Sequence, residues 1–153
     1  MSKVLFREIR RQHADEHAVL EDAMRLLLRA AEGDDPRPLE AAFTDLERRL
    51  MAHLELEERW LFPLVEYRYA GDVLTLRDEH AQLRSLMAQI ERAGEVHQVT
   101  RPMLETLATL LAGHGRREGE ALSRWFDESA PVETRQGLPR LFVEMLRNEL
   151  HTS

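Results

Sequence analysis

The sequence predicts an all-α fold, an antiparallel up-down-up-down four-helix bundle with a short C-terminal fifth helix. Large residues recur at steps of three and four along four long segments, which is the spacing of a helix that faces a core. Short breaks that contain glycine or proline separate the first segments, and the second half of the chain repeats the pattern of the first. We expect residues 1–130 to form the bundle and residues 131–153 to form an amphipathic helix packed on it.

The composition is that of a globular protein and excludes several classes of site. Of the 153 residues, 43% are hydrophobic and 32% are charged, which suits one domain with a core. There is no cysteine, so disulfides and thiolate metal sites are excluded. The net charge of −7 argues against nucleic acid as a partner, because nucleic-acid binding usually needs a basic face. Without an apolar run of ~20 residues or a signal peptide, we expect no membrane span and a cytoplasmic location.

The first helix is predicted over residues 2–32, with Ser2 available as its cap. Its stripe of regularly spaced residues is Phe6, Ile9 or Arg10, His13, His17, Leu20, Met24, Leu27 and Ala31. Gly33 and Pro36 end this helix, because glycine suits a helix terminus and proline cannot continue one. Asp35 or Pro36 then opens the second helix.

The second helix carries the stripe Leu39, Phe43, Leu46, Leu50, His53, Glu57, Trp60 and Leu64. Pro63 lies inside this pattern, where it removes a backbone hydrogen bond and usually kinks or ends a helix. Glu57 and His80 share a level in antiparallel helices only if the turn is centred near Arg68, so residues 66–71 are the expected connection. Trp60 is expected in the core, as is Trp125 of the fourth helix.

The third helix is predicted over residues 72–93, with Asp72 as its N-cap and the stripe Leu76, His80, Leu83, Met87 and Ile90. Residues 94–99 form a loop. The fourth helix is predicted over residues 100–127, with Pro102 tolerated in its first turn. Its stripe is Leu104, Leu107, Leu111, His114, Glu118, Ala121 and Trp125.

A last amphipathic segment covers residues 134–150 and carries Leu138, Leu141, Phe142, Met145, Leu146 and Leu150. We expect it to be the fifth helix, packed on the bundle. The alternative is a dimerisation surface, in which case residues 138–150 would form a homodimer contact.

The two halves of the chain share an internal repeat. Residues 15–20 (DEHAVL) match residues 78–83 (DEHAQL) at five of six positions, 63 residues apart, and His53-x3-Glu57 corresponds to His114-x3-Glu118, 61 residues apart. The paired stripe histidines are equally far from turns centred at residues 35 and 97. Six polar residues can therefore meet at one depth of the bundle; they are His17, His53, Glu57, His80, His114 and Glu118.

Such a cluster predicts a metal site. Two buried carboxylates close together would drive one of them to protonate unless a cation neutralises them. Two divalent ions resolve this, since each glutamate can bridge them while the histidines fill terminal positions. Imidazole and carboxylate together suit iron, manganese or zinc. The alternative is that these are core histidines hydrogen-bonded to glutamate.

The chain resembles the hemerythrin-like, or HHE cation-binding, domains over about residues 9–127. The resemblance rests on Glu16-His17, on His53-x3-Glu57-Glu58 followed by Leu61-Phe62-Pro63, on Glu79-His80 and on His114-x3-Glu118. It implies two iron ions with an oxo or hydroxo bridge that bind O2 or related small ligands. Carried over by position, it implies His17 and His53 on one iron, His80 and His114 on the other, and Glu57 and Glu118 as bridges.

The sequence departs from the oxygen-carrying hemerythrins. Those proteins have His-x3-His on the third helix, where this chain has Leu76 first, and His-x4-Asp on the fourth, where it has His114-x3-Glu118. The ligand set is closer to the branch that includes iron-sulfur repair and iron- or oxygen-sensing proteins. His13 lies one turn before His17 on the same face and is either a fifth histidine ligand or a residue that lines the pocket.

Three functions fit the cluster. The first is a di-iron protein that binds or senses O2, NO or peroxide, or handles iron and oxidative stress. The second is an enzyme, either a di-iron oxidoreductase or an iron-sulfur repair protein, with catalytic residues not identified. The third is an interaction module that a structural metal, such as zinc, holds together.

Glu16 and Glu79 are either hydrogen-bond partners of the ligand imidazoles or solvated residues.

Overall fold

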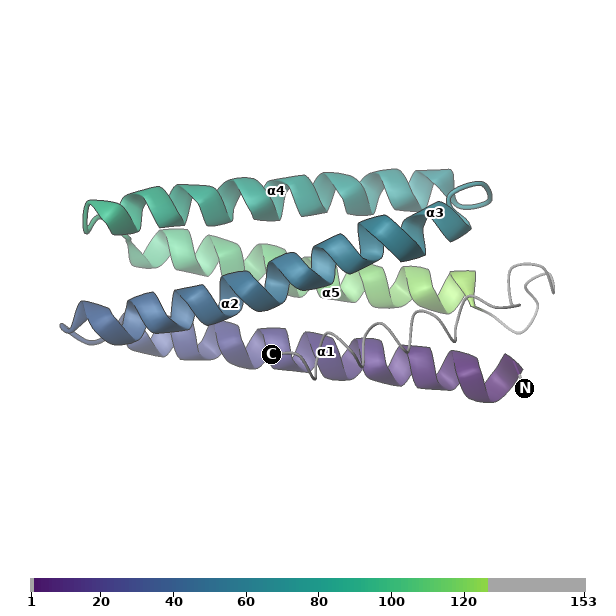
Figure 1. Ribbon diagram of the computed structural model, residues 1–153, viewed down its shortest axis with the longest axis horizontal. Helices are drawn as coiled ribbons and strands as arrows, with labels where there is room; N and C mark the ends of the chain where they lie inside the picture. The colour runs from purple at the N-terminus through teal and green to yellow at the C-terminus, as the bar shows by residue number, and fades with distance from the viewer. Residues whose placement is uncertain (1, 127–153) are drawn as a thin grey trace.

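The computed structural model describes residues 2–126, with side chains from residue 7 onward. The elements are α1 (Ser2–Ala30), α2 (Pro36–Leu56), the π-helical turn η1 (Glu57–Leu61), α3 (Phe62–Val65), α4 (Ala70–Glu95) and α5 (Arg101–Trp125). α2, η1 and α3 follow one another without a break, so the described residues make four long helical segments (Figure 1). The predicted all-α fold with four helices is therefore confirmed for this part of the chain.

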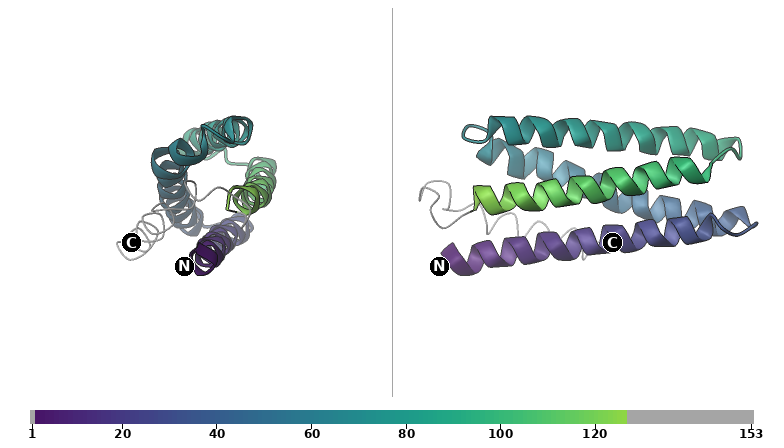
Figure 2. Two further views of the ribbon diagram at one scale, coloured as in Figure 1. Left: turned by 90° about the vertical axis from the view of Figure 1, so that its right-hand side faces the viewer. Right: turned by 180° about the vertical axis from the view of Figure 1, so that it is seen from behind.

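The four segments surround one common core. α1 packs against α2 and α5, and α4 packs against α5 and α2. The end-on view in Figure 2 shows the segments arranged around a central axis, and each connection between them lies at an end of the bundle (Figure 1). Every helix therefore presents one stripe of side chains to the same interior.

The start of α2 follows the sequence signals closely. Asp35 is its N-cap, and its carboxylate accepts a hydrogen bond from the backbone N–H of Arg37 at 3.0 Å. Pro36 follows in the first turn, where its missing N–H leaves no hydrogen bond unmade. The connection after Val65 covers residues 66–69, inside the predicted range 66–71.

Asp72 is not the N-cap of α4, because that helix begins at Ala70, two residues earlier than predicted. Asp72 lies in the first turn, where a carboxylate still interacts favourably with the helix dipole. It also accepts a hydrogen bond from the indole Nε1–H of Trp125 at 3.0 Å and pairs with Arg124 at 3.0 Å. Trp125 is fully buried, as predicted.

The second helical segment changes register at η1. This π-helical turn holds one residue more than an α turn, and the N–H of Phe62 donates to the carbonyl of Glu57, five residues earlier. Pro63 follows directly. Proline has no N–H, and in a regular helix its ring clashes with the carbonyl four residues before it, so the wider turn accommodates it. The chain therefore stays helical through Pro63 to Val65.

The extra residue moves the buried stripe, so the predicted core positions of Trp60 and Leu64 are wrong. These side chains are 37% and 40% exposed, whereas Leu61 and Val65, one position later, are 1% and 0% exposed. The stripe up to Glu57 follows the predicted spacing because the segment is a regular α-helix as far as Leu56.

Two apolar clusters fill the bundle, one on either side of a polar layer. The first contains Ile9, Leu56, Leu61, Phe62, Val65, Val73, Leu76, Ala121, Leu122, Trp125 and Phe126. The second contains Leu20, Ala23, Met24, Leu27, Leu46, Leu50, Leu54, Leu83, Met87, Ile90, Leu104, Leu107 and Leu111. On each of the four segments the polar stripe residues lie between members of the two clusters, so both clusters seal the polar layer from the ends of the bundle.

Some expectations fall outside the described residues. The fifth helix over residues 131–153 and the homodimer contact over residues 138–150 both lie there, and the division of the chain at residue 130 stays a prediction. Within residues 2–126, no helix combines the length and the apolar character that crossing a bilayer requires.

The register shift can be tested by two alanine substitutions in adjacent positions. Leu61→Ala should lower the free energy of unfolding by about 2–5 kcal/mol, because it leaves a cavity in the first apolar cluster. Trp60→Ala should cost less than about 1 kcal/mol, because the indole is partly exposed. Urea unfolding of both variants measures the difference. A larger loss for Trp60→Ala would support a regular α-helix through this segment and contradict the π turn.

Candidate metal centre

The polar layer gathers histidine and glutamate side chains from all four segments. Seven side chains converge there, and each is at most 8% exposed: His13, His17, His53, Glu57, His80, His114 and Glu118. The structure thus brings together all six predicted ligand residues and also His13. It does so because equal distances from the turns set these stripe residues at one depth of the bundle.

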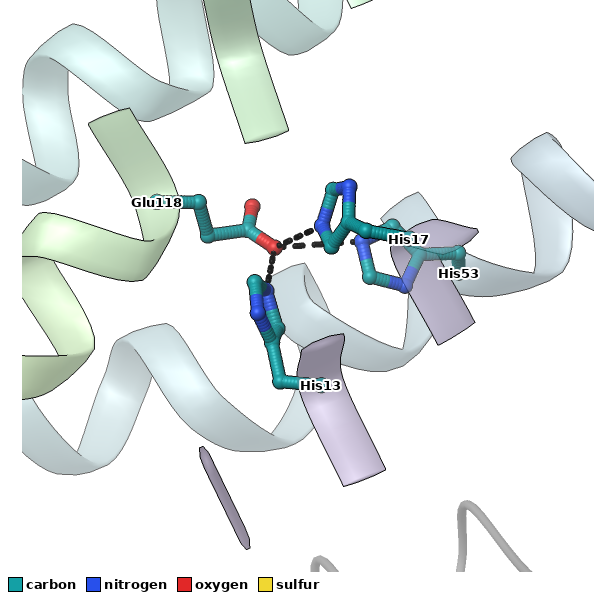
Figure 3. A group of neighbouring side chains, drawn as sticks. All are labelled: His13, His17, His53 and Glu118. Atoms are coloured by element: carbon teal, nitrogen blue, oxygen red, sulfur yellow. Dashed lines mark hydrogen bonds and ion pairs between the residues drawn. The ribbon is translucent and has the colours of Figure 1, made fainter. Parts of the chain in front are cut away.

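Glu118 of α5 lies at the centre of this cluster. Its Oε1 is 2.9 Å from His17 Nε2 and 3.1 Å from His53 Nε2, and it also contacts His13 Nε2 (Figure 3). Its Oε2 faces the other way and lies 2.8 Å from His114 Nε2. One carboxylate therefore contacts histidines on both sides of the bundle.

Glu57 occupies a similar position on the opposite segment. Its Oε1 lies 2.9 Å from His53 Nε2 and 3.5 Å from His80 Nε2. Neither of its carboxylate oxygens makes a hydrogen bond within the described part of the chain, although both are buried. His80 Nε2, His114 Nε2 and Glu118 Oε2 are likewise buried, and their close contacts, including the 2.8 Å pair of His114 and Glu118, lack the geometry of a hydrogen bond.

These unbonded atoms test whether a cation suits the cluster. Leaving buried polar atoms without partners costs about 1–3 kcal/mol each, and more where a group is charged. Imidazole nitrogens and carboxylate oxygens that face one another are the donors that iron, manganese and zinc accept. The donor set therefore fits a metal cofactor.

Two overlapping groups of donor atoms lie close enough together to hold an ion. One comprises His13, His17, His53 and Glu118, and the other comprises His53, Glu57, His114 and Glu118. Within each group all donor atoms lie within 4.8 Å of one another. His13, which the sequence left open between ligand and pocket residue, belongs to the first group by position. His80 lies at the edge of the second, with its Nε2 3.8 Å from Glu118 Oε2.

A second layer of carboxylates contacts the outer nitrogens of the rings. Glu16 Oε1 lies 2.7 Å from His53 Nδ1, and Glu79 Oε1 lies 2.9 Å from His114 Nδ1. Such contacts fix which ring nitrogen carries the proton and hold the other nitrogen toward the centre. Of the two alternatives that the sequence left open for these glutamates, the structure supports the contact with imidazole.

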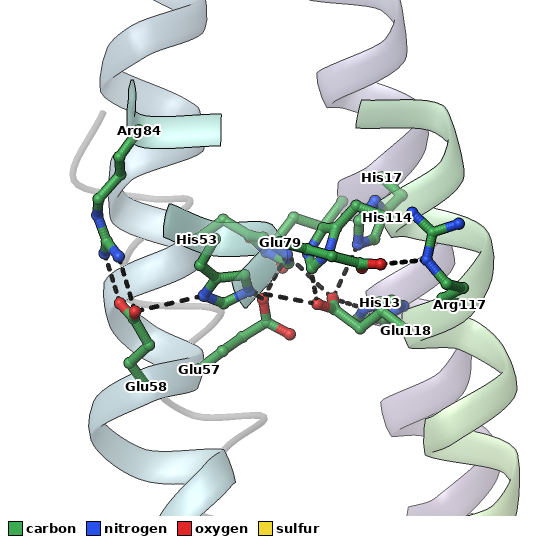
Figure 4. Close-up of polar contacts among 12 residues, drawn as sticks. His13, His17, His53, Glu57, Glu58, Glu79, Arg84, His114, Arg117 and Glu118 are labelled. Atoms are coloured by element: carbon green, nitrogen blue, oxygen red, sulfur yellow. Dashed lines mark hydrogen bonds and ion pairs between the residues drawn. The ribbon is translucent and has the colours of Figure 1, made fainter. Parts of the chain in front are cut away.

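Two arginines complete this outer layer, and neither was predicted from the sequence. Arg84 Nη1 donates to Glu58 at 2.7 Å, and Glu58 lies 3.5 Å from His80 Nδ1. Arg117 donates to Glu79 (Figure 4). Glu58 could have been suspected because it directly follows Glu57. The arginines could not, because each pairs across to another helix.

Three of the histidines favour the charged form in this environment. Burial alone would lower the pKa of each, but the carboxylates of Glu57 and Glu118 outweigh burial. As a result the pKa of His53 is raised well above its usual range, that of His80 rises to about 9, and that of His114 is also raised. Without a metal, protons on these rings neutralise the two central carboxylates.

The remaining members shift in the direction that their surroundings dictate. Burial lowers the pKa of His17, and its contact with Glu118 does not make up for this. Burial would raise the pKa of Glu118, but the surrounding histidines, His13 first, hold it well below its usual range. Glu118 is thus an anion whose charge must be balanced, either by protons on the histidines or by a metal.

Comparison with known proteins agrees with this chemistry. The hemerythrin HHE cation-binding domain family matches residues 5–126. A DNA nickase from Nostoc sp. (strain PCC 7120 / SAG 25.82 / UTEX 2576) is 29% identical over 92 residues, which make up 60% of this chain and 26% of the relative. The matched region thus spans about a quarter of that relative's length. No solved structure is significantly similar.

The family match runs from α1 to the end of α5 and includes every residue of the buried cluster. The chain therefore belongs to the hemerythrin HHE cation-binding domain family.

Proposed function

We propose that the chain is a non-haem di-iron protein that binds or senses O2, NO or peroxide, or takes part in handling iron and oxidative stress. The observation that carries the proposal is the position of Glu118, whose two carboxylate oxygens face histidines on opposite sides of the bundle. A buried carboxylate in that position suits two cations better than one.

The donors divide between the two ions as follows. His13, His17 and His53 would hold one ion, His80 and His114 would hold the other, and Glu57 and Glu118 would lie between them. The unbonded atoms of Glu57, His80 and His114 support the second position. When bound, two irons would supply the redox chemistry and bind the small ligand. Zinc or manganese would fit the same donors.

The other candidate functions use the same residues. An oxidoreductase or an iron-sulfur repair protein would add turnover to ligand binding, and a structural module would hold a metal that does not react. The match to the DNA nickase from Nostoc spans about a quarter of that protein, which is too little to support the same activity for this chain. The net charge of −7 likewise favours small ligands over nucleic acid. We also propose a cytoplasmic location.

The proposal predicts the metal content of the purified chain. Protein from iron-supplemented cells should hold close to two irons per chain, with near-ultraviolet bands that bleach on anaerobic reduction and return in air. Glu118→Gln should lower the iron content at least about tenfold, because it removes the shared charge. Glu120→Gln, an exposed control on the same helix, should change nothing. Zinc alone, with no spectral response to O2 or NO, would favour the structural module instead.

A second prediction concerns His13. His13→Leu should lower the iron content from two toward one per chain and change the charge-transfer bands, because only one of the two ions uses this ring. His97→Asn is the control, since His97 is exposed in the turn between α4 and α5 and asparagine tolerates its positive φ of 55°. Iron content and bands that are unchanged in His13→Leu would show that His13 only lines the pocket.

A third prediction concerns how the stability of the metal-free chain depends on pH, because protons on the histidines take the place of the metal in balancing the carboxylates. In the metal-free chain, the raised pKa values of His53, His80 and His114 contribute stability that is fully present below about pH 6.5. This stability is lost as the pH rises toward 9, the pKa of His80. The melting temperature of the chelator-treated protein should therefore fall by at least about 5 °C between pH 6.5 and 9.

The metal-loaded protein should show no such fall, because a ring nitrogen that binds metal cannot take up the second proton that titrates in this range. Circular dichroism melts of both forms across this pH range give the comparison. A melting temperature of the metal-free form that stays level or rises with pH would contradict the assigned charges of the histidines.

A further inference from the structure

A cleft of about 260 Å³ opens between α1 and α5 beside the metal centre. Its lining includes Arg10, His13 and His17 from α1 and Gly115 and Gly119 from α5. The two histidines are 4% and 8% exposed, whereas the other members of the buried cluster are at most 2% exposed. Among the described residues, the cleft is thus the place where the cluster comes closest to solvent.

Two glycines one helical turn apart create this opening. A Cβ atom at Gly115 would lie 2.7 Å from His17 Nδ1, so any larger residue there would displace the ring. A Cβ atom at Gly119 would meet nothing within 4 Å, so this position borders open space. Gly115 therefore leaves room for the imidazole ring of His17, and Gly119 leaves an open space through which a small molecule could approach that ring.

The internal repeat shows that the opening is specific to one side of the bundle. The repeat of 61 residues relates Gly115 to Leu54 and Gly119 to Glu58 on the opposite face. There, between α2 and α4, Glu58 lies 3.5 Å from the outer nitrogen of His80 and is held by Arg84. One of two related surfaces is closed by an ion pair, and the other is left open by glycine.

We propose that the cleft at Gly115 and Gly119 is the route by which a small ligand reaches the metal centre, and that Gly119 sets the size limit. The identity of the ligand rests on the proposed function. We expect a diatomic or triatomic molecule that is neutral or carries one negative charge. The guanidinium of Arg10 in the lining favours anions. The route itself depends only on the shape of the chain.

The first test measures azide binding to the iron-loaded chain by stopped-flow spectroscopy, with rates expressed per bound iron. Gly119→Leu should lower the association rate at least about tenfold, because the added side chain fills the cleft. Gly119→Met provides a second, more flexible side chain of similar size in case leucine disturbs packing. Gly119→Ala adds only a Cβ for which there is space, so its rate should stay within about twofold of the wild type.

A remote control separates the cleft from a general effect of leucine. Gly71 near the start of α4 also has nothing within 4 Å of a built Cβ, but it does not line the cleft. Gly71→Leu should leave azide binding unchanged. An unchanged association rate in both Gly119→Leu and Gly119→Met would overturn the proposal.

A second readout needs no metal. Diethyl pyrocarbonate modifies accessible imidazoles, and mass spectrometry of the metal-free chain gives the rate at His17 relative to the exposed His97. This ratio should fall at least about tenfold in Gly119→Leu and stay unchanged in Gly71→Leu. His53 and His80 should remain unmodified, which confirms that the variant is folded.

The two readouts distinguish the two proposals. If the wild-type chain holds no metal, the proposed function fails and the labelling ratio alone decides the cleft. If the chain holds metal and the azide association rate is unchanged in both Gly119→Leu and Gly119→Met, the cleft proposal fails while the metal centre stands.

Discussion

The structure depends on one electrostatic constraint: two carboxylates lie fully buried in the middle of a helical bundle. Glu57 and Glu118 are sealed between two apolar clusters, where an isolated charge would cost several kcal/mol. Five histidines surround them. His53, His80 and His114, whose pKa values are raised, can supply positive charge as protons, and the cluster can also hold it as metal. The outer carboxylates and arginines then fix the direction of the rings. Each layer of the site follows from the need to neutralise the one inside it.

The convergence of the site residues could be predicted from the sequence because it depends only on helical spacing and turn position. His53 and Glu57 lie four residues apart on one helix, and equal distances from the turns bring His17 and His53 to the same depth. The residues after Glu57 could not be placed in this way. The spacing to Trp60 assumes a regular α-helix, and the response of the backbone to Pro63 adds a residue that no periodicity reveals.

Contacts between helices were also harder to predict than contacts within one helix. Glu16 and Glu79 sit beside stripe histidines of their own helices, but each contacts a histidine of the neighbouring helix. Arg84 and Arg117 reach glutamates on other helices, and their side-chain rotamers follow from packing rather than from sequence spacing. The internal repeat defines the common plan of the two halves. The two halves differ at some equivalent positions; for example, His13 in the first half corresponds to Leu76 in the second.

The π turn has a consequence for the two sides of the site. Glu118 projects from the interior of a regular α-helix, α5. Glu57 begins a π-helical turn, where hydrogen bonds span five residues and the backbone is less tightly wound. The two central carboxylates therefore differ in the backbone that carries them. Only on the side of Glu57 does the helix change register directly after the carboxylate, so Leu61 and Val65 enter the core in place of Trp60 and Leu64.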